Sequence, residues 1–312
     1  MASGNALDQF IAEEISAPVH GIESLIEEIR SIYGDSLAAI LFYGSCLRTG
    51  DYRDKVLDFY VIVDSYRAAY KRRWLAAANR VLPPNVFYTE ADGDRFRLRV
   101  KYAVLSIGHF DVLASGRTFN SSVWVRFAQP CRLVYVRDRD ARARMIRSVA
   151  RSVTTAVHSV VGLLGEPVTA ERIWCELFRE SYRVELRAEG GGRPRDIFDA
   201  ARDRYEAITP IALAQLDLRT DQQGSVMSDG NRLPGSANQR IAWTLRMVQG
   251  KVLSMLRLLK AAFTFDGGID YLAWKIRRHA GVDITITPWQ RRHPVIAGLI
   301  LFVQLRLKGA FR

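Results

Sequence analysis

Residues 41–64 read LFYGSCLRTGDYRDKVLDFYVIVD. An apolar run ends in the pair Gly44-Ser45, about a dozen mostly polar residues follow, and a second apolar run begins with a single acid, Asp58. Short runs rich in branched and aromatic residues on either side of a turn are typical of neighbouring strands. The stretch therefore predicts strands over residues 37–43 and 57–63, with a glycine turn after the first and a carboxylate at the start of the second.

The residue types at this turn suit phosphate chemistry. A glycine lets backbone N–H groups approach a ligand closely, and the hydroxyl of Ser45 can bond a phosphate oxygen. A carboxylate beside the turn can hold the Mg²⁺ that bridges nucleotide phosphates. The turn and Asp58 are thus predicted to be two ends of one nucleotide site. The alternative is an ordinary strand-to-helix turn at Gly44 and Ser45, with Asp58 as a solubilising acid at a strand edge.

Composition limits the class of protein and of partner. The chain has 312 residues, 48% of them hydrophobic, and carries 45 Lys and Arg against 33 Asp and Glu, a formal charge of +12. Such a chain can bury a sizeable core and favours an anionic partner: a nucleotide, a nucleic acid or an acidic lipid surface. Because no RNA-binding motif accompanies the basic charge, nucleic acid is the weakest of the three.

Cysteine usage and the N-terminus predict a reducing, cytoplasmic setting. Cys46, Cys131 and Cys175 are far apart and form no CxxC pair, so neither a disulfide framework nor a zinc site is indicated. The first residues carry acids and no long apolar region, unlike a secretory signal or a transit peptide. No segment reaches the roughly 20 apolar residues that a membrane-spanning helix needs.

Periodicity divides the chain into a mixed region and a helical region. Apolar spacing predicts two helices within residues 6–33, helices at 66–80 and 109–119, and further strands at 95–107 and 132–136. Beyond residue 139 it predicts helices at 142–164, 169–186, 195–209 and 239–263, with a loop at 217–235. The fold class is therefore α+β. The predicted divisions are a small mixed sheet with flanking helices (1–140), a helical domain (141–268) and a C-terminal segment (269–312).

The arrangement of strand, Gly-Ser, variable loop and acid resembles the nucleotidyltransferase fold. Most members carry two acids spaced Asp-x-Asp, whereas Tyr60 stands two residues after Asp58 here. Asp64 cannot replace the missing acid, because six residues along a strand span about 20 Å. A second carboxylate therefore has to come from another part of the chain, or the site has only one.

Within that fold, the chain resembles the mitochondrial-type phosphatidate cytidylyltransferases, the translocator-maintenance family of CDP-diacylglycerol synthases. The similar segments lie in the same order over roughly residues 25–260: YGS at 43–45, LDFYVIVD at 57–64, VKYAVLS at 100–106, VRFAQPCRLV at 125–134, FRESYRVELR at 178–187 and, weakly, LPG at 233–235. The chain departs from the family pattern at Cys46, at Val184-Glu185 and in AAANRVLPPNVFY. These departures bear on the geometry of the nucleotide loop and on the identity of the substrate.

The resemblance implies transfer of CMP from CTP to phosphatidic acid, giving CDP-diacylglycerol and pyrophosphate, with Mg²⁺ at Asp58. It implies two groups of site residues, catalytic Asp58, Lys101 and Glu185 and substrate-binding Gly44, Ser45, Arg126, Ser181, Tyr182 and Arg187. Other interpretations stay open for four of them. Lys101 could be one of the polar residues that alternate with apolar residues along a strand, as Arg97 and Arg99 are. Glu185 could face solvent or pair with an arginine, and Ser181 and Tyr182 could pack or form hydrogen bonds locally.

Two further functions also fit these residues. One is a soluble nucleotidyltransferase acting on a small molecule, an RNA or a protein, which would need neither lipid nor membrane. The other is a catalytically silent nucleotide-binding protein, suggested by the missing second acid.

The C-terminal segment predicts contact with a membrane surface. Residues 270–312 combine Trp274, Trp289 and many aliphatic residues with eight basic residues: Lys275, Arg277, Arg278, Arg291, Arg292, Arg306, Lys308 and Arg312. That mixture suits an amphipathic basic helix lying on an anionic bilayer. We therefore expect a cytoplasmic protein, peripheral on the inner face of the cell membrane. A packed terminal helix with a solvated basic edge is the alternative.

Overall fold

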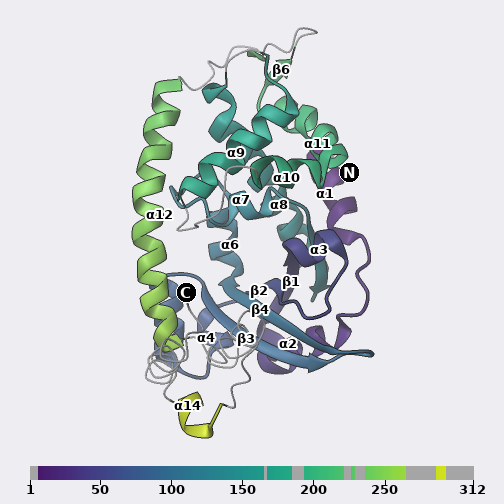
Figure 1. Ribbon diagram of the computed structural model, residues 1–312, viewed down its shortest axis with the longest axis vertical. Coiled ribbons are helices and arrows are strands. Elements are labelled where there is room, and N and C mark those ends of the chain that lie inside the picture. Colours follow the sequence, from purple (N-terminus) through teal and green to yellow (C-terminus); the bar gives the residue numbers. More distant parts are fainter. Residues whose placement is uncertain are drawn as a thin grey trace, which may run out of the picture.

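The computed structural model describes residues 6–164, 167–184, 193–220, 226–228, 236–264 and 286–292. The mixed part comprises α1 (Ala6–Ser16), α2 (Glu23–Tyr33), β1 (Leu37–Tyr43), α3 (Ser45–Thr49), β2 (Leu57–Val63), α4 (Tyr66–Ala69), α5 (Arg73–Val81), β3 (Asn85–Asp92), β4 (Arg97–Ser106), α6 (Ile107–Ala114), α7 (Trp124–Phe127) and β5 (Cys131–Val136). The helical part comprises α8 (Arg139–Val160), α9 (Ala170–Val184), α10 (Arg193–Asp199), α11 (Arg202–Gln215), β6 (Leu218–Thr220), β7 (Val226–Ser228), α12 (Ser236–Thr264) and α14 (Pro288–Arg292). A mixed sheet with flanking helices, followed by helices, confirms the predicted fold class (Figure 1).

The main sheet has the strand order β3-β4-β2-β1-β5. Strands β2 and β4 are parallel, and every other neighbouring pair is antiparallel. The predicted bounds of β1 and β2 agree with the structure residue for residue. Because β2 lies between β1 and β4, the start of β2 is flanked by the end of β1 and the start of β4.

The side chains of β2 alternate between two separate cores. Phe59 and Val61 join a cluster with Ile29 and other residues of α2 on one face of the sheet. Tyr60 and Ile62 join a second cluster on the other face, together with α1, α6 and α8. Helices cover both faces, which explains why β2 reads as a nearly continuous apolar run. Asp58, with the parity of Tyr60, begins the face that points toward the helical half.

Helices α8, α9 and α11 build the upper part of the molecule in Figure 1, and α12 runs beside them down to the sheet. Trp174 on α9 lies beside Tyr205 on α11, with ring centroids 4.6 Å apart, and both are buried. Trp243 of α12 is buried against Trp124 of α7. Gly250 lets α12 approach α9, because a Cβ there would lie 2.3 Å from a methyl carbon of Val184. The long helix thus closes one side of the space above the sheet.

Several local predictions were wrong, for identifiable reasons. The predicted helix at 66–80 is two helices, because Tyr70 takes extended geometry (φ −117°, ψ 124°) and turns its buried hydroxyl toward Asn79. Strand β3 was not predicted, since its apolar start runs into Thr-Glu-Ala-Asp. The predicted loop at 217–235 contains two short strands, β6 and β7, paired antiparallel. The turn after Gly44 continues into α3.

Most of the C-terminal segment lies outside the described residues. The predicted basic amphipathic helix is described only at α14, and the division of the chain at 140 and 268 stays a prediction. Within the described part, no helix combines the length and the hydrophobicity that crossing a bilayer requires.

Candidate functional site

The side chains of Tyr43, Asp58 and Lys101 form one row across the sheet. In the strand register Tyr43 of β1 is opposite Asp58, and Asp58 is opposite Lys101 of β4. Side chains directly opposite each other on neighbouring strands point to the same face. The parallel pairing of β2 and β4 therefore brings Lys101, some forty residues away in sequence, beside Asp58.

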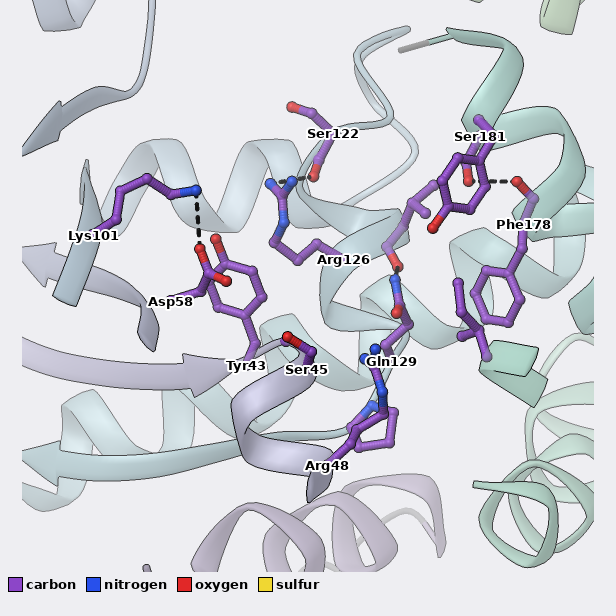
Figure 2. A pocket seen from close by; sticks show the side chains of 15 residues that line it. Tyr43, Ser45, Arg48, Asp58, Lys101, Ser122, Arg126, Gln129, Phe178 and Ser181 are labelled. Carbon is purple, nitrogen blue, oxygen red and sulfur yellow. Dashed lines mark hydrogen bonds and ion pairs between the residues drawn. The ribbon is translucent and has the colours of Figure 1, made fainter. Parts of the chain in front are cut away.

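Asp58 and Lys101 form an ion pair, with Asp58 Oδ1 3.1 Å from Lys101 Nζ (Figure 2). Their side chains are 26% and 39% exposed, so the pair faces solvent on one side. Arg97 and Arg99, which share the strand and face of Lys101, pair instead with Glu90 of β3. Lys101 thus differs from the other cations of β4, because its partner lies at the Gly-Ser turn.

Gly44 touches the same carboxylate from the other side. Its backbone (φ 94°, ψ −166°) lies in a region that residues with a side chain rarely adopt. A Cβ built there would lie 3.1 Å from Asp58 Oδ2. The glycine is therefore required both by its conformation and by the carboxylate beside it.

Arg126, on α7, lies above this row. Its guanidinium donates hydrogen bonds to the hydroxyl of Tyr60 (3.0 Å) and to the carbonyl of Ser122 (3.1 Å). It also lies 5.2 Å from the ring centroid of Tyr43 and 5.7 Å from that of Tyr60. Tyr60, two residues after Asp58, thus holds an arginine at the site.

A cavity of about 210 Å³ collects these groups. Gly44, Ser45, Asp58, Lys101, Arg126, Ser181 and Tyr182, all predicted site residues, line it. Ser181 also donates a hydrogen bond to the carbonyl of Phe178 at 2.9 Å, the local bond expected in the alternative interpretation. Glu185 and Arg187 lie outside the described residues, so their roles stay predictions.

Sequence reasoning missed three polar residues of the cavity, namely Arg48, Ser122 and Gln129. Arg48 lies one helical turn after Gly44, and its N–H bonds the carbonyl of Gly44 at 3.3 Å, so its place in the cavity depends on the short helix α3, which was not predicted. Ser122 and Gln129 flank α7 and had no pattern of their own. Together with Lys101 and Arg126, Arg48 gives the cavity three cations.

The donor set decides how a metal ion would fit. Asp58 is the one carboxylate among the described residues that line the cavity, and Lys101 is already paired with it. Within the described part of the chain, no three His, Cys, Asp or Glu side chains cluster as metal ligands. Mg²⁺ commonly uses one or two carboxylates plus substrate phosphates. Asp58 and the Ser45 hydroxyl therefore fit an ion that arrives with a triphosphate, and they do not form a complete protein cage.

A second cavity, of about 500 Å³, adjoins the first and shares Tyr43, Lys101, Ser122, Val125, Arg126 and Ser181 with it. Its other walls are mainly apolar and basic, with Pro84, Val86, Ala103, Val184 and Ala261 beside Arg246, Arg257 and Lys260 of α12, and they include the neutral polar side chains of Tyr60, Asn120, Ser121, Gln249 and Ser254. No acid lines it among the described residues. The polar cavity thus continues into an apolar one that carries positive charge.

The cations of α12 are held at this second cavity by specific contacts. Lys260 Nζ donates to the carbonyls of Leu82 and Pro84, the latter at 2.6 Å, and Arg257 Nε donates to the carbonyl of Pro83 at 3.0 Å. Burial, together with the charge of Arg257, lowers the pKa of Lys260 to about 8. An anion in the cavity would favour the protonated form of Lys260.

Arg246 is the least satisfied of these cations. Its guanidinium lies 5.1–5.7 Å from the ring centroids of Trp243, Trp124 and Phe119, and its buried Nε has no hydrogen-bond partner. Burial lowers the pKa of Arg246. A buried cation without a hydrogen-bonded counter-charge is costly, so this position favours an anionic ligand.

Comparisons with known proteins add little to this geometry. No family model matches the chain, and no curated protein matches it. Among solved structures, a nucleotidyltransferase-like protein from Exiguobacterium sibiricum 255-15 is similar over 93% of this chain and 91% of its own, at 9% identity and a TM-score of 0.28. A TM-score this low does not establish a common fold. The assignment of the site therefore depends on the geometry of the chain itself.

Replacing Gly44 should separate its two roles. We expect Gly44→Ala to lower the free energy of unfolding by about 1–3 kcal/mol, the cost of a strained backbone. It should also weaken binding of CTP, the nucleotide that the sequence resemblance implies, because the new Cβ displaces the Asp58 carboxylate. Gly50→Ala is the matched control: Gly50 also has positive φ (65°), but a Cβ there meets no atom within 4 Å. Urea unfolding and equilibrium dialysis measure both effects, and equal CTP binding by the two variants would contradict the role of Gly44.

Proposed function

We propose that the chain transfers CMP from CTP to phosphatidic acid, giving CDP-diacylglycerol and pyrophosphate. The observation that carries the proposal is the continuity of two cavities, one polar and built around Gly44, Asp58 and Lys101, the other apolar and basic. A nucleotide triphosphate suits the first, and an acceptor with an apolar body and a phosphate suits the second. The order of similar segments along the sequence supports the same reaction.

In this proposal the first cavity orients the triphosphate. Backbone N–H groups at Gly44-Ser45, the ammonium of Lys101 and the guanidinium groups of Arg48 and Arg126 would bind its oxygens. Mg²⁺ entering with the nucleotide would neutralise part of the triphosphate charge, with Asp58 as its protein ligand. Glu185, just beyond the described end of α9, stays a candidate for a second carboxylate or for positioning Arg187.

The second cavity supplies the acceptor. The unpartnered Nε of Arg246 and the ammonium of Lys260 would pair with the phosphate of the lipid, and the apolar walls would contact the start of its acyl chains. Arg126, shared by both cavities, lies where the two phosphates would meet. Holding the two anions together is the main electrostatic task of the site.

The reaction then needs no strong general base. A phosphate monoester is largely dianionic at neutral pH, since its second pKa is about 6. One of its oxygens attacks the α-phosphorus of CTP, the bond from that phosphorus to the bridging oxygen breaks, and pyrophosphate leaves with the electron pair. Alignment and charge neutralisation by the cations are what the chain contributes.

Incubation with CTP labelled at the α-phosphate, Mg²⁺ and phosphatidic acid tests the proposal directly. Label in the lipid phase supports it. Label transferred only to a soluble acceptor would indicate a soluble nucleotidyltransferase, and CTP binding without any transfer would indicate a silent nucleotide-binding protein.

Asp58→Asn should reduce transfer by at least about a hundredfold, because it removes the only described carboxylate of the cavity and leaves Lys101 without its ion-pair partner. The free energy of unfolding should change by less than about 1 kcal/mol, since no core volume is lost. Glu90→Gln is the matched control, because Glu90 is similarly exposed (24%) and pairs with arginines on the same sheet, outside the cavity. Retained activity in Asp58→Asn would reject the site.

Arg246→Met tests the acceptor cavity. We expect the KM for phosphatidic acid to rise about tenfold while the KM for CTP stays constant, because a charge-assisted bond to the acceptor is lost. The free energy of unfolding should change by less than about 1 kcal/mol, because removal of the buried, unbonded Nε offsets the loss of the contacts between Arg246 and its three aromatic neighbours. Arg240→Met, an exposed position on the same helix, should leave both KM values unchanged. Equal effects on both KM values would contradict an acceptor role.

We further propose that the protein acts while bound to an anionic membrane surface, cytoplasmic and on the inner face of the cell membrane. The composition of residues 270–312 supports this, and α12 adds support from the described part. Its exposed apolar side chains, 45–58% accessible, form one stripe: Ile241, Leu245, Val248, Val252, Met255 and Leu256. The sequence of α12 contains five Lys and Arg and no acid. Such a helix suits an anionic lipid surface.

Val252→Glu should lower co-sedimentation with phosphatidic acid vesicles about tenfold, because it replaces an apolar contact by a charge of the same sign as the lipid. Ile32→Glu is the control, since Ile32 of α2 is an equally exposed apolar residue (45%) outside the stripe. High salt should also weaken binding, because screening shortens the reach of the cations to a few ångströms at 1 M. If Val252→Glu sediments like the parent, the stripe on α12 is not the contact.

A further inference from the structure

A third cavity, of about 520 Å³, lies at the opposite end of the parallel strands from Asp58 and Lys101. In the register of β2 and β4, Asp58 is opposite Lys101 at one end, and Val63 is opposite Ser106 at the other. The seven residues of β2 separate the two ends by about 20 Å. The cavity is lined by residues 64–67, 70, 73, 76, 77, 80, 106, 108 and 109. It is therefore separate from the proposed nucleotide and acceptor cavities.

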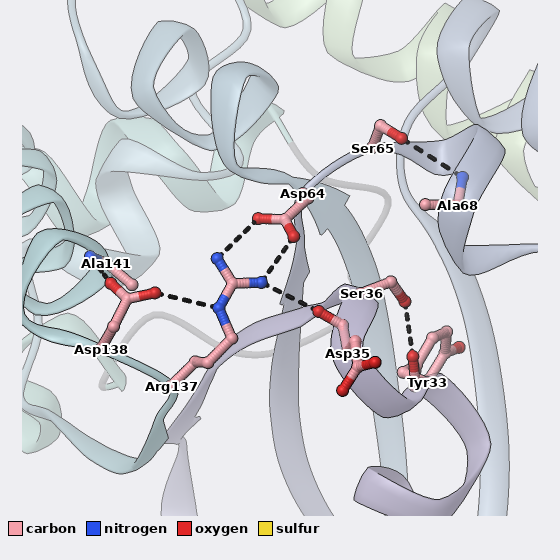
Figure 3. A network of polar contacts seen from close by, with 9 residues as sticks. All are labelled: Tyr33, Asp35, Ser36, Asp64, Ser65, Ala68, Arg137, Asp138 and Ala141. Atoms are coloured by element: carbon pink, nitrogen blue, oxygen red, sulfur yellow. Dashed lines mark hydrogen bonds and ion pairs between the residues drawn. The ribbon is translucent and has the colours of Figure 1, made fainter.

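Three arginines of this cavity lack counter-charges. Arg67 of α4 and Arg73 and Arg80 of α5 are exposed, and none forms an ion pair or a side-chain hydrogen bond with a described residue. The one acid of the lining, Asp64, is already engaged, since its two oxygens accept hydrogen bonds from Arg137 at 2.5 and 3.1 Å (Figure 3). The cavity thus presents three guanidinium groups whose charge the described residues do not neutralise.

Further donors surround the arginines. The side chain of Ser106 caps α6 by accepting a hydrogen bond from the N–H of His109, and the first turn of this helix borders the cavity, since Ser106, Gly108 and His109 line it. Gly108, in that turn, borders open space, because a Cβ there would meet no atom within 4 Å. The cavity therefore combines backbone donors with cations.

Tyr66 and His109 add a neutral pair. Burial raises the pKa of Tyr66 to about 12 and lowers the pKa of His109, on which the charge of Arg80 acts in the same direction. At neutral pH both side chains are therefore uncharged, and the tyrosine hydroxyl shares a hydrogen bond of 2.9 Å with Nδ1 of His109, whose direction depends on the histidine tautomer. Both side chains thus offer polar atoms to the cavity without adding a negative charge.

Helix α5, which carries two of the arginines, is fixed to the sheet. Buried Asn79 donates hydrogen bonds to the hydroxyl of Tyr70 (2.8 Å) and to the carbonyl of Val104 (3.0 Å), and it accepts one from the N–H of Asn85 (2.7 Å). These bonds tie α5 to β3 and β4. The spacing of Arg73 and Arg80 is therefore set by the fold, which favours binding of a particular ligand.

We propose that this cavity binds a phosphate group, carried either by a small phosphorylated molecule or by a phospholipid headgroup. Guanidinium groups match the planar geometry of phosphate oxygens better than ammonium groups do, and several of them bind a multiply charged anion. Backbone N–H groups at the start of α6 favour the same charge. The proposal does not depend on the reaction at Asp58.

The proposal is tested by calorimetric titration of inorganic pyrophosphate into the full chain and into the double variant Arg73→Gln/Arg80→Gln. Because charge-assisted bonds are lost, pyrophosphate should bind this variant at least about tenfold more weakly at one site. Lys101→Met should leave that site intact, since Lys101 lies at the other end of the strands. A matched control removes the same charge elsewhere: Arg139→Gln/Arg151→Gln on α8, two exposed arginines outside this cavity. Thermal unfolding verifies that each variant is folded.

A second arm uses vesicles of phosphatidylcholine with and without phosphatidic acid. Weaker binding of the Arg73/Arg80 variant to pyrophosphate supports a small phosphorylated ligand. A loss confined to phosphatidic acid vesicles supports a headgroup. The proposal is overturned if the variant binds both probes like the parent, or if the Arg139/Arg151 variant loses as much binding, because the effect would then be one of net charge alone.

Discussion

The ion pair between Asp58 and Lys101 is the contact on which the site depends. It exists because β2 and β4 are parallel and in a register that places the two residues opposite each other. The same carboxylate contacts Gly44, so one side chain joins the turn after β1 to the start of β4. A shift of one residue in either strand would turn Asp58 or Lys101 to the other face and dissolve the site. Register is thus a functional constraint here as well as a structural one.

The register is in turn fixed by the two cores. Alternate residues of β2 join different clusters, so a slip would bury Asp58 against α2 and expose Phe59 to the cavity. Burying an unpaired carboxylate and exposing an aromatic ring are both costly. The apolar run that makes β2 recognisable in the sequence therefore also determines which way its one acid points.

Features that depend on residues close together in the sequence were predicted, and features that depend on contacts between distant residues were not. Strands β1 and β2 and the meeting of Gly44, Ser45 and Asp58 follow from one local pattern, and the structure agrees with it. The arginines at 48 and 246 carry no such pattern, since their place depends on a short helix after the turn and on the docking of α12. Likewise the break at Tyr70 depends on Asn79, nine residues later. Local periodicity does not contain these tertiary contacts.

Tyr60, two residues after Asp58, shows how a neutral side chain sets the balance of charge in the cavity. A carboxylate at this position would repel an anionic ligand, whereas the tyrosine hydroxyl accepts a hydrogen bond from Arg126. The described cavity consequently has three cations around a single acid that is already paired. An anionic ligand meets net attraction from the protein itself, and less of the neutralisation has to come from a bound ion. The positive charge continues into the apolar cavity along α12, so a second anion placed there would meet the same attraction from the protein.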